Sequence, residues 1–335
     1  MTKLHTYRQA GLAVLAGVGI ILAASAPASA QAPEKASFQT NWRAQAEHGG
    51  FYQALATGIY TKHGIDAEIR MGGPQQDPNA LLLAGRVDFI MNNAFAGFNY
   101  AKENLPFVVI AAMFQKDPQV LMSHPGVGHD TLAAMKGKPI LIGAGGRTSY
   151  WPFLRAKFGF TDEQIRPYTF NLAPFLSDKS AIQQGFLSSE PFTATLAGVT
   201  PVVHLLADAG FENYQTTINA SRRLIETKPD FVQRFVNASI EGWYSYIYGD
   251  PTPGNALIKK DNPDMTDDKI AYAIKAMKEH GIVDSGDTKQ YGIGAMTDAR
   301  WASFFKSNVE AGVYPADVDF KKAYTLQFVN KRVGM

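Results

Sequence analysis

Residues 37–61 read SFQTNWRAQAEHGGFYQALATGIYT, and this stretch decides the fold class. Its first four residues favour a strand. After a polar turn, a helix is predicted over 49–61, because apolar residues recur every four positions from Phe51 to Ile59. A second strand is predicted at 65–70. The order strand, helix, strand predicts a βαβ unit and a mainly parallel sheet flanked by helices.

The same alternation continues along the chain, and the last third is mostly helical. Further strands are predicted at 87–91, 107–114, 120–123 and 138–143, and helices at 79–84 and from about residues 149, 227, 266 and 297. The C-terminal helices need a sheet to cover. We therefore expect an α/β protein of two lobes. Lobe 1 would comprise 36–120 plus 221–335 and lobe 2 would comprise 124–215, with hinge crossings near 118–124 and 214–221.

The N-terminus has the pattern of a secretory signal peptide. Lys3 and Arg8 precede an apolar run at 10–24, which an Ala-Ser-Ala cleavage site follows. The alternative, an uncleaved anchor, needs an apolar run of about 20 residues, which is longer than this one. We predict a cleaved signal peptide over 1–30 and an exported, soluble protein that begins at Gln31.

Composition excludes several classes of function. There is no cysteine, which excludes disulfides, thiolate nucleophiles, cysteine-ligated metals and a lipid anchor at the cleavage point. The formal charge is +2, and without the signal peptide acids and bases would be equal in number. A nucleic-acid-binding protein is usually basic, so no nucleic-acid partner is expected.

Polar and aromatic side chains follow the first strand, where ligands of open parallel sheets bind. Trp42 is suited to stack on a flat ring, and Glu47 or His48 to hydrogen-bond with ring nitrogens. The alternative is a tryptophan that covers the edge of a core. Asn92 and Asn93 follow the strand at 87–91 in the same way, and either of them would also suffice as an ordinary helix N-cap.

A glycine-rich segment, GAGGRTSYWP, follows the strand at 138–143 and contains Gly145, Gly146, Arg147, Thr148 and Trp151. A dinucleotide fingerprint would need glycine where threonine stands, and no Walker lysine follows, so no nucleotide cofactor is expected. The exposed N–H groups and the guanidinium suit an anion or a carbonyl oxygen. The alternative is a tight turn with core aromatics.

Glu190 lies in SSEPF, where the following proline favours an extended backbone and the carboxylate is suited to accept from an amino group of a ligand. A solvated loop acid is the alternative. Enzyme motifs such as Gly-x-Ser-x-Gly and His-Glu-x-x-His are absent. His124, His129 and Asp130 favour a turn, and no metal site is predicted.

The order of several segments resembles a known family: NWRAQAEHGGFYQAL, GIYTKHGIDAEI, LLAGRVDFIMNN, ENLPFVVIAAM, SSEPF, ADAGFENYQTTINAS and KPDFVQRFVNASIEGW. They are similar to ABC-transporter periplasmic solute-binding proteins for nitrate, sulfonate, taurine and thiamine-pyrimidine precursors, and closest to the last of these. The resemblance implies the type II periplasmic-binding fold, which closes on its ligand, and no catalysis or cofactor. It implies a monomer that serves an inner-membrane permease and its ATPase.

The resemblance also implies a set of ligand-binding residues: Trp42, Glu47, Asn92, Asn93, Gly145, Gly146, Arg147 and Glu190. The segments described above add His48, Thr148 and Trp151 to the predicted ligand-binding set. The first ligand hypothesis is a small planar nitrogen-containing solute, such as a thiamine-precursor pyrimidine. Arg147 departs from what a neutral pyrimidine needs, so a sulfonate, carboxylate or nitrate-like anion is the alternative. A periplasmic enzyme of pyrimidine metabolism is a third hypothesis. The chain has no cysteine and so lacks the cysteine- and histidine-rich segment of the synthase relatives, which argues against that hypothesis.

Overall fold

The computed structural model describes residues 1–2, 32–73 and 76–335, so the predicted signal peptide lies outside the described residues apart from its first two positions. Contacts divide the chain into two units, Met1–Ala32 and Pro33–Met335. Both sheets and all named helices belong to the second unit.

The described strands form two five-stranded sheets of the same design. Sheet A has the order β2-β1-β3-β10-β4 and sheet B the order β7-β6-β8-β5-β9. In each sheet four strands share one direction, and one strand, β10 or β5, is antiparallel to both neighbours. The bounds are β1 Glu34–Gln39, β2 Ile65–Arg70, β3 Phe89–Asn92, β4 Phe107–Phe114, β5 Gln119–Ser123, β6 Ile140–Ile142, β7 Ile165–Pro167, β8 Ile182–Phe186, β9 Val202–Leu205 and β10 Gln215–Ser221.

The chain builds sheet A with β1 to β4, builds sheet B with β5 to β9, and returns to sheet A with β10. The two antiparallel strands are therefore the ones at which the chain passes from one sheet to the other. Two mixed sheets flanked by helices confirm the predicted fold class. The lobe limits and hinge crossings given above stay predictions.

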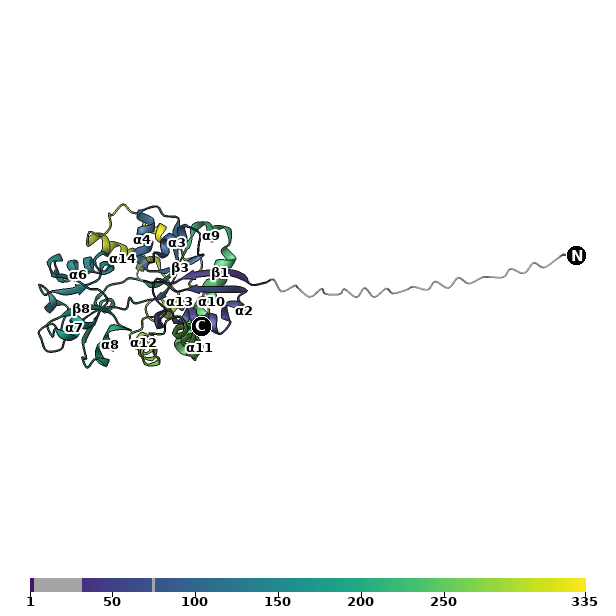
Figure 1. Ribbon diagram of the computed structural model, residues 1–335. Helices are drawn as coiled ribbons and strands as arrows, with labels where there is room; N and C mark the ends of the chain where they lie inside the picture. The colour runs from purple at the N-terminus through teal and green to yellow at the C-terminus, as the bar shows by residue number, and fades with distance from the viewer. Residues whose placement is uncertain (3–31, 74–75) are drawn as a thin grey trace. The chain divides into compact units, whose positions relative to one another are not determined.

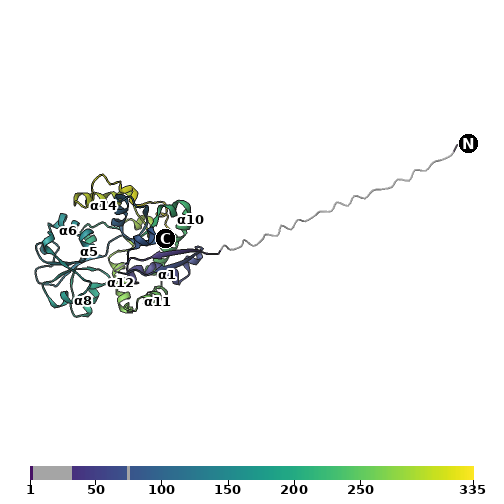
Figure 2. The ribbon, with the colours of Figure 1, turned by 45° about the horizontal axis from the view of Figure 1, so that its top comes forward.

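Helices cover both sheets. Figures 1 and 2 both show α6 and α8 on one side of the described fold and α10 and α11 on the other. None of the described helices is long and apolar enough to span a membrane. Their bounds are α1 Gly49–Ala56, α2 Ile59–Lys62, α3 Pro78–Leu83, α4 Ala94–Lys102, α5 Ala144–Thr148, α6 Trp151–Phe158, α7 Ala173–Ser177, α8 Glu190–Leu196, α9 Arg222–Thr227, α10 Pro229–Tyr248, α11 Thr252–Asp261, α12 Asp267–Glu279, α13 Thr288–Tyr291 and α14 Asp298–Glu310.

The first helix packs closely on α10, and this contact explains its glycines. A Cβ on Gly50 would lie 2.2 Å from the ring of Trp243, and one on Gly242 would lie 2.3 Å from the carbonyl oxygen of Gly50. The predicted helix over 49–61 is interrupted, because Gly58 has φ +72° and separates α1 from α2. The glycine pair at the start of α1, directly after the turn that carries Glu47, thus serves the close packing of α1 on α10.

Candidate functional site

Two adjoining cavities lie where elements of sheet A face elements of sheet B. We call the smaller one, about 380 Å³, the inner cavity, and the larger one, about 860 Å³, the outer cavity. Both volumes fall in the range of about 300–1,000 Å³ that is usual for ligand pockets. The two cavities share four lining residues, Gln119, Phe170, Gln184 and Gln215, so they form two compartments of one cleft.

The inner cavity has an aromatic ring from each side. Trp42 follows β1 of sheet A, Phe170 follows β7 of sheet B, and their ring centroids are 5.6 Å apart. Phe170 is 60% exposed and has φ +60°, and Thr216, at the start of β10 in the same cavity, has φ +51°. Such backbone conformations are costly outside glycine and cluster at functional sites. At this distance and with their planes tilted by 42° the two rings contact each other, so together they form an aromatic surface on which a flat group can stack.

Two carboxylates line the same inner cavity. Glu47, in the 3₁₀ turn Ala46–His48, accepts a hydrogen bond from Ser188 Oγ, which lies on the sheet B side. Glu190 accepts from the backbone N–H of Phe186 at 2.7 Å and from the Tyr168 hydroxyl at 3.5 Å. Burial raises the pKa of both carboxyl groups, and the negative charge of Glu190 raises the pKa of Glu47 further. Each carboxylate keeps lone pairs that a ligand donor can use.

Glu190 differs in backbone conformation from the sequence prediction. It is the first residue of α8, and Pro191 occupies the next position, where a proline has no helical N–H to lose. The helix start therefore replaces the extended segment that we expected, and it brings the carboxylate back onto Phe186 N–H.

Two further polar side chains of the inner cavity have buried atoms without a partner among the described residues. These atoms are His48 Nδ1 and Asn41 Oδ1. Burial lowers the pKa of His48 to about 3, so its ring is neutral at physiological pH. A buried polar atom without a partner is costly, and a bound ligand is one way to satisfy it.

The charge of the inner cavity is one-sided. The described residues that line it include Glu47 and Glu190 but no lysine or arginine. Arg147, the residue on which the anion hypothesis depends, is exposed and lies outside the lining of both cavities. The inner cavity therefore suits hydrogen-bond donors and disfavours anions.

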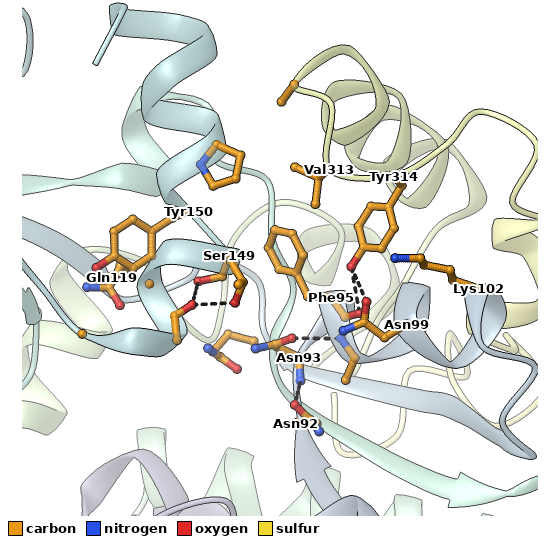
Figure 3. Close-up of a pocket in the computed structure, with 18 of the residues that line it drawn as sticks. Asn92, Asn93, Phe95, Asn99, Lys102, Gln119, Ser149, Tyr150, Val313 and Tyr314 are labelled. Carbon is orange, nitrogen blue, oxygen red and sulfur yellow. Dashed lines mark hydrogen bonds between the residues drawn. The ribbon is translucent and has the colours of Figure 1, made fainter. Parts of the chain in front are cut away.

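The outer cavity contains the other amides that the sequence singled out. Asn92 and Asn93 lie at its floor in Figure 3, between Ser149 and Tyr150 on one side and Asn99 and Tyr314 on the other. Asn93 also caps α4, because its Oδ1 accepts from Ala96 N–H at 3.2 Å. The capping role and the cavity position therefore coexist in one residue.

The glycine-rich segment is divided between the cavity and the core. Gly145, Gly146 and Thr148 line the outer cavity and belong to the short helix α5. Trp151 lines neither cavity: it is buried at the start of α6, and its indole N–H donates to Asp162 at 2.9 Å. The expected single helix from about residue 149 is two short helices, α5 ending at Thr148 and α6 beginning at Trp151.

Sequence reasoning missed the four residues that both cavities share. Gln119 and Gln215 are the first residues of β5 and β10, the two strands at which the chain changes sheets. Polar residues at those two strand starts were a usable signal. Phe170 and Gln184 had none, since one lies in a loop and the other in the middle of β8.

Among the residues that the structure describes, no three histidines or acids lie close enough to hold a metal ion. His124 instead bonds to the Phe175 carbonyl at 2.7 Å and stacks on the Phe175 ring. Asp130 accepts from Gly126 N–H at 3.1 Å, so Asp130 stabilises its local turn while His124 joins that turn to α7.

With the fold and cleft described, the comparisons with known proteins give the class. The family model described as "NMT1/THI5 like" matches residues 45–253, more than half of the chain, and the chain belongs to this family. This confirms the resemblance found in the sequence. A curated relative, the riboflavin-binding protein RibY of Chloroflexus aurantiacus, is 22% identical, with 91% of each chain covered.

Solved structures share the fold at lower identity. The periplasmic aliphatic sulphonate binding protein SsuA from Escherichia coli has a TM-score of 0.65 and 16% identity, over 88% of this chain and 92% of that one. The desulfurization enzyme DSZB has a TM-score of 0.58 and 12% identity, over 88% of this chain and 97% of that one. Binding proteins and an enzyme therefore share this architecture, and function has to be argued from the cleft.

Proposed function

We propose that the protein is a periplasmic solute-binding component of an ABC importer, and that it captures a small planar nitrogen heterocycle in the inner cavity. The observation that carries this proposal is the composition of that cavity. Trp42 and Phe170 offer aromatic faces from opposite sides, and Glu47 and Glu190 offer carboxylates without a neighbouring cation.

Each feature selects a property of the ligand. Two rings from opposite sides favour a flat group, because offset aromatic contacts add about 0.5–1.5 kcal/mol beyond area burial. Carboxylates favour ring N–H or amino groups, which donate charge-assisted hydrogen bonds. A thiamine-precursor aminopyrimidine has both properties, and so does the isoalloxazine ring of the riboflavin named in the relative RibY.

The transport role rests on family membership together with a cleft built from two sheets. The hydrogen bond between Ser188 and Glu47 joins the two sides across the ligand site, as closure on a ligand requires. In this proposal the predicted signal peptide exports a soluble monomer, which delivers its ligand unchanged to an inner-membrane permease and its ATPase. The named residues act by binding, without turnover.

A sulfonate or related anion is the second candidate, favoured by the likeness to SsuA. It would have to use the outer cavity, because the inner one repels negative charge. Lys102 and Arg155 are the cations that line the outer cavity, and both are exposed. The first candidate uses the buried groups of the cleft, so it is the function we propose.

Calorimetric titration of the exported protein, freed of bound ligand by unfolding and refolding, tests the choice. The probes are hydroxymethyl aminopyrimidine, lumiflavin and ethanesulfonate. The proposal predicts one-to-one binding of at least one heterocycle, recovery of that heterocycle unchanged, and no binding of the sulfonate. Binding of ethanesulfonate alone, or conversion of the heterocycle, would overturn it.

A further inference from the structure

The outer cavity has a chemistry of its own, which the flat-ring proposal leaves unused. Apart from the charged residues at its rim, its lining presents carboxamides, of which Asn99 is exposed: Asn79, Asn92, Asn93, Asn99, Gln119, Gln184 and Gln215. We infer that this cavity is a second subsite, which binds an uncharged, hydroxylated chain attached to the ring in the inner cavity. This inference rests on the proposed function and specifies the class of ligand further.

Backbone hydrogen bonds fix the orientation of three of these amides. The side-chain oxygen of Asn93 accepts from Ala96 N–H at 3.2 Å, that of Gln184 from Gly143 N–H at 2.5 Å, and that of Gln215 from Thr216 N–H at 3.0 Å. A backbone N–H can only donate, so each amide oxygen must face it. Each NH₂ group is left without a partner among the described residues, at the wall of the cavity.

Asn99 follows the same pattern from the opposite wall. Its Oδ1 accepts from the Tyr314 hydroxyl at 2.8 Å, which leaves its NH₂ group free of a partner among the described residues (Figure 3). The cavity therefore presents several neutral donors that are spaced around its walls. Hydroxyl oxygens along a short chain accept from such donors, and the hydroxyl hydrogens can donate to Gln119 Oε1, whose own NH₂ group is already bonded to Gly185.

The charged residues of the outer cavity lie at its rim. Lys102 and Glu103 are exposed, adjacent in the sequence and opposite in charge. Arg155 is also exposed, and it forms an ion pair with Asp162 at 3.4 Å. These charges are solvated or balanced, so the interior offers no buried cation to a phosphate. A neutral chain is therefore the substituent that this cavity fits.

Connection between the two subsites is provided by the residues that they share. Phe170, Gln119, Gln184 and Gln215 line both cavities, so a ligand can place its ring on one side of them and its chain on the other. The ring site alone measures about 380 Å³ and the outer cavity about 860 Å³, so the larger volume is the one that a bare ring leaves empty.

Two matched series of ligands test this inference by calorimetry: lumiflavin, riboflavin and flavin mononucleotide, and cytosine, cytidine and cytidine monophosphate. In the series that binds, the hydroxylated member should bind at least about tenfold more tightly than the bare ring, since two or three neutral hydrogen bonds are added. The phosphorylated member should gain nothing further. Equal affinity for ring and hydroxylated compound, or strongest binding of the phosphate, would overturn the second subsite alone.

Absence of binding in both series and of hydroxymethyl aminopyrimidine would instead contradict the ring site and thus the proposed function. A variant separates the subsites further. Asn99→Leu should weaken riboflavin binding by about fivefold and leave lumiflavin binding unchanged. Asn99 is exposed on α4, so the substitution spares the core. The control Gln290→Leu makes the same kind of change at an exposed amide of α13 that lines neither cavity, and it should leave both affinities within about twofold. An equal loss for both flavins in Asn99→Leu would contradict the assignment.

Discussion

The two compartments of the cleft share four residues and differ in what they offer a ligand. The inner cavity has two aromatic rings and two carboxylates, whereas the outer cavity has amides, of which Asn93, Asn99, Gln184 and Gln215 have NH₂ groups free of protein partners among the described residues. One compartment accepts hydrogen bonds and stacks on a ring, and the other mainly donates hydrogen bonds. The difference indicates that ring and substituent are recognised separately, by two sets of side chains.

Removal of the stacking ring should have the largest effect. Trp42→Ala should weaken binding of lumiflavin and riboflavin alike, by about 100-fold, because it deletes one aromatic face of the inner cavity. Titration of both ligands measures the loss. A loss restricted to riboflavin would mean that the ring does not lie beside Trp42, and would reverse the roles of the two compartments.

Neutralising a carboxylate should have the next largest effect. Glu190→Gln keeps an oxygen for Phe186 N–H but removes the charge, so the affinity for the ring should fall by about tenfold. Burial raises the pKa of Glu190 and of Glu47, and the ionised forms accept from the ring. Affinity of the wild-type protein should therefore decrease as the pH is lowered through those raised pKa values.

This pH dependence should be weaker in Glu190→Gln, and titrations between about pH 8 and about pH 5 measure it. Glu163→Gln, an exposed position on the sheet B side, makes the same change of charge outside both cavities and should behave as the wild type. Equal behaviour of the two variants would show that the carboxylate of Glu190 does not contact the ring.

A smaller effect is expected where the two sides meet. Ser188→Ala removes the hydroxyl that donates to Glu47, which should weaken ring binding by about threefold. The Ser188 hydrogen bond lowers the pKa of Glu47, so its loss should move the decline in affinity to higher pH. An unchanged pH profile in the same titrations would show that the hydrogen bond from Ser188 to Glu47 does not influence ligand binding.

The smallest effect separates the two ligand hypotheses. Arg147→Ala should leave heterocycle affinity within about twofold, because the guanidinium is exposed and lines neither cavity. Titration of this variant with lumiflavin and with ethanesulfonate measures its affinity for a heterocycle and for an anion, and so tests both ligand hypotheses. A large loss for either ligand would show that Arg147 enters the cleft and would revive the anion hypothesis.

The sequence was informative wherever a strand ends at the cleft. Trp42, Glu47 and Asn92 each follow or end a strand of sheet A. The carboxyl ends of parallel strands meet at one edge of a sheet, so their positions in the sequence predicted that all three lie at that edge. The same rule placed Trp151 beside a ligand, but the direction of a side chain depends on where its helix begins. Trp151 is the first residue of α6, where its buried indole N–H donates to Asp162 and its ring lines neither cavity.

Other features of the cleft could not be predicted from spacing along the chain. Phe170 meets Trp42 only because sheet B faces sheet A, and the free NH₂ groups of Gln184 and Gln215 are defined by backbone partners that the fold supplies. The interrupted helix at Gly58 was likewise a local event that periodicity alone did not indicate. Side-chain direction and contacts between the sheets thus had to come from the structure.

Native mass spectrometry of the protein purified from its own host tests the central claim most directly. The bound mass would be released by denaturation and identified. We expect one flat nitrogen heterocycle per chain, carrying an uncharged hydroxylated substituent. A stoichiometric sulfonate, carboxylate or other anion would contradict it.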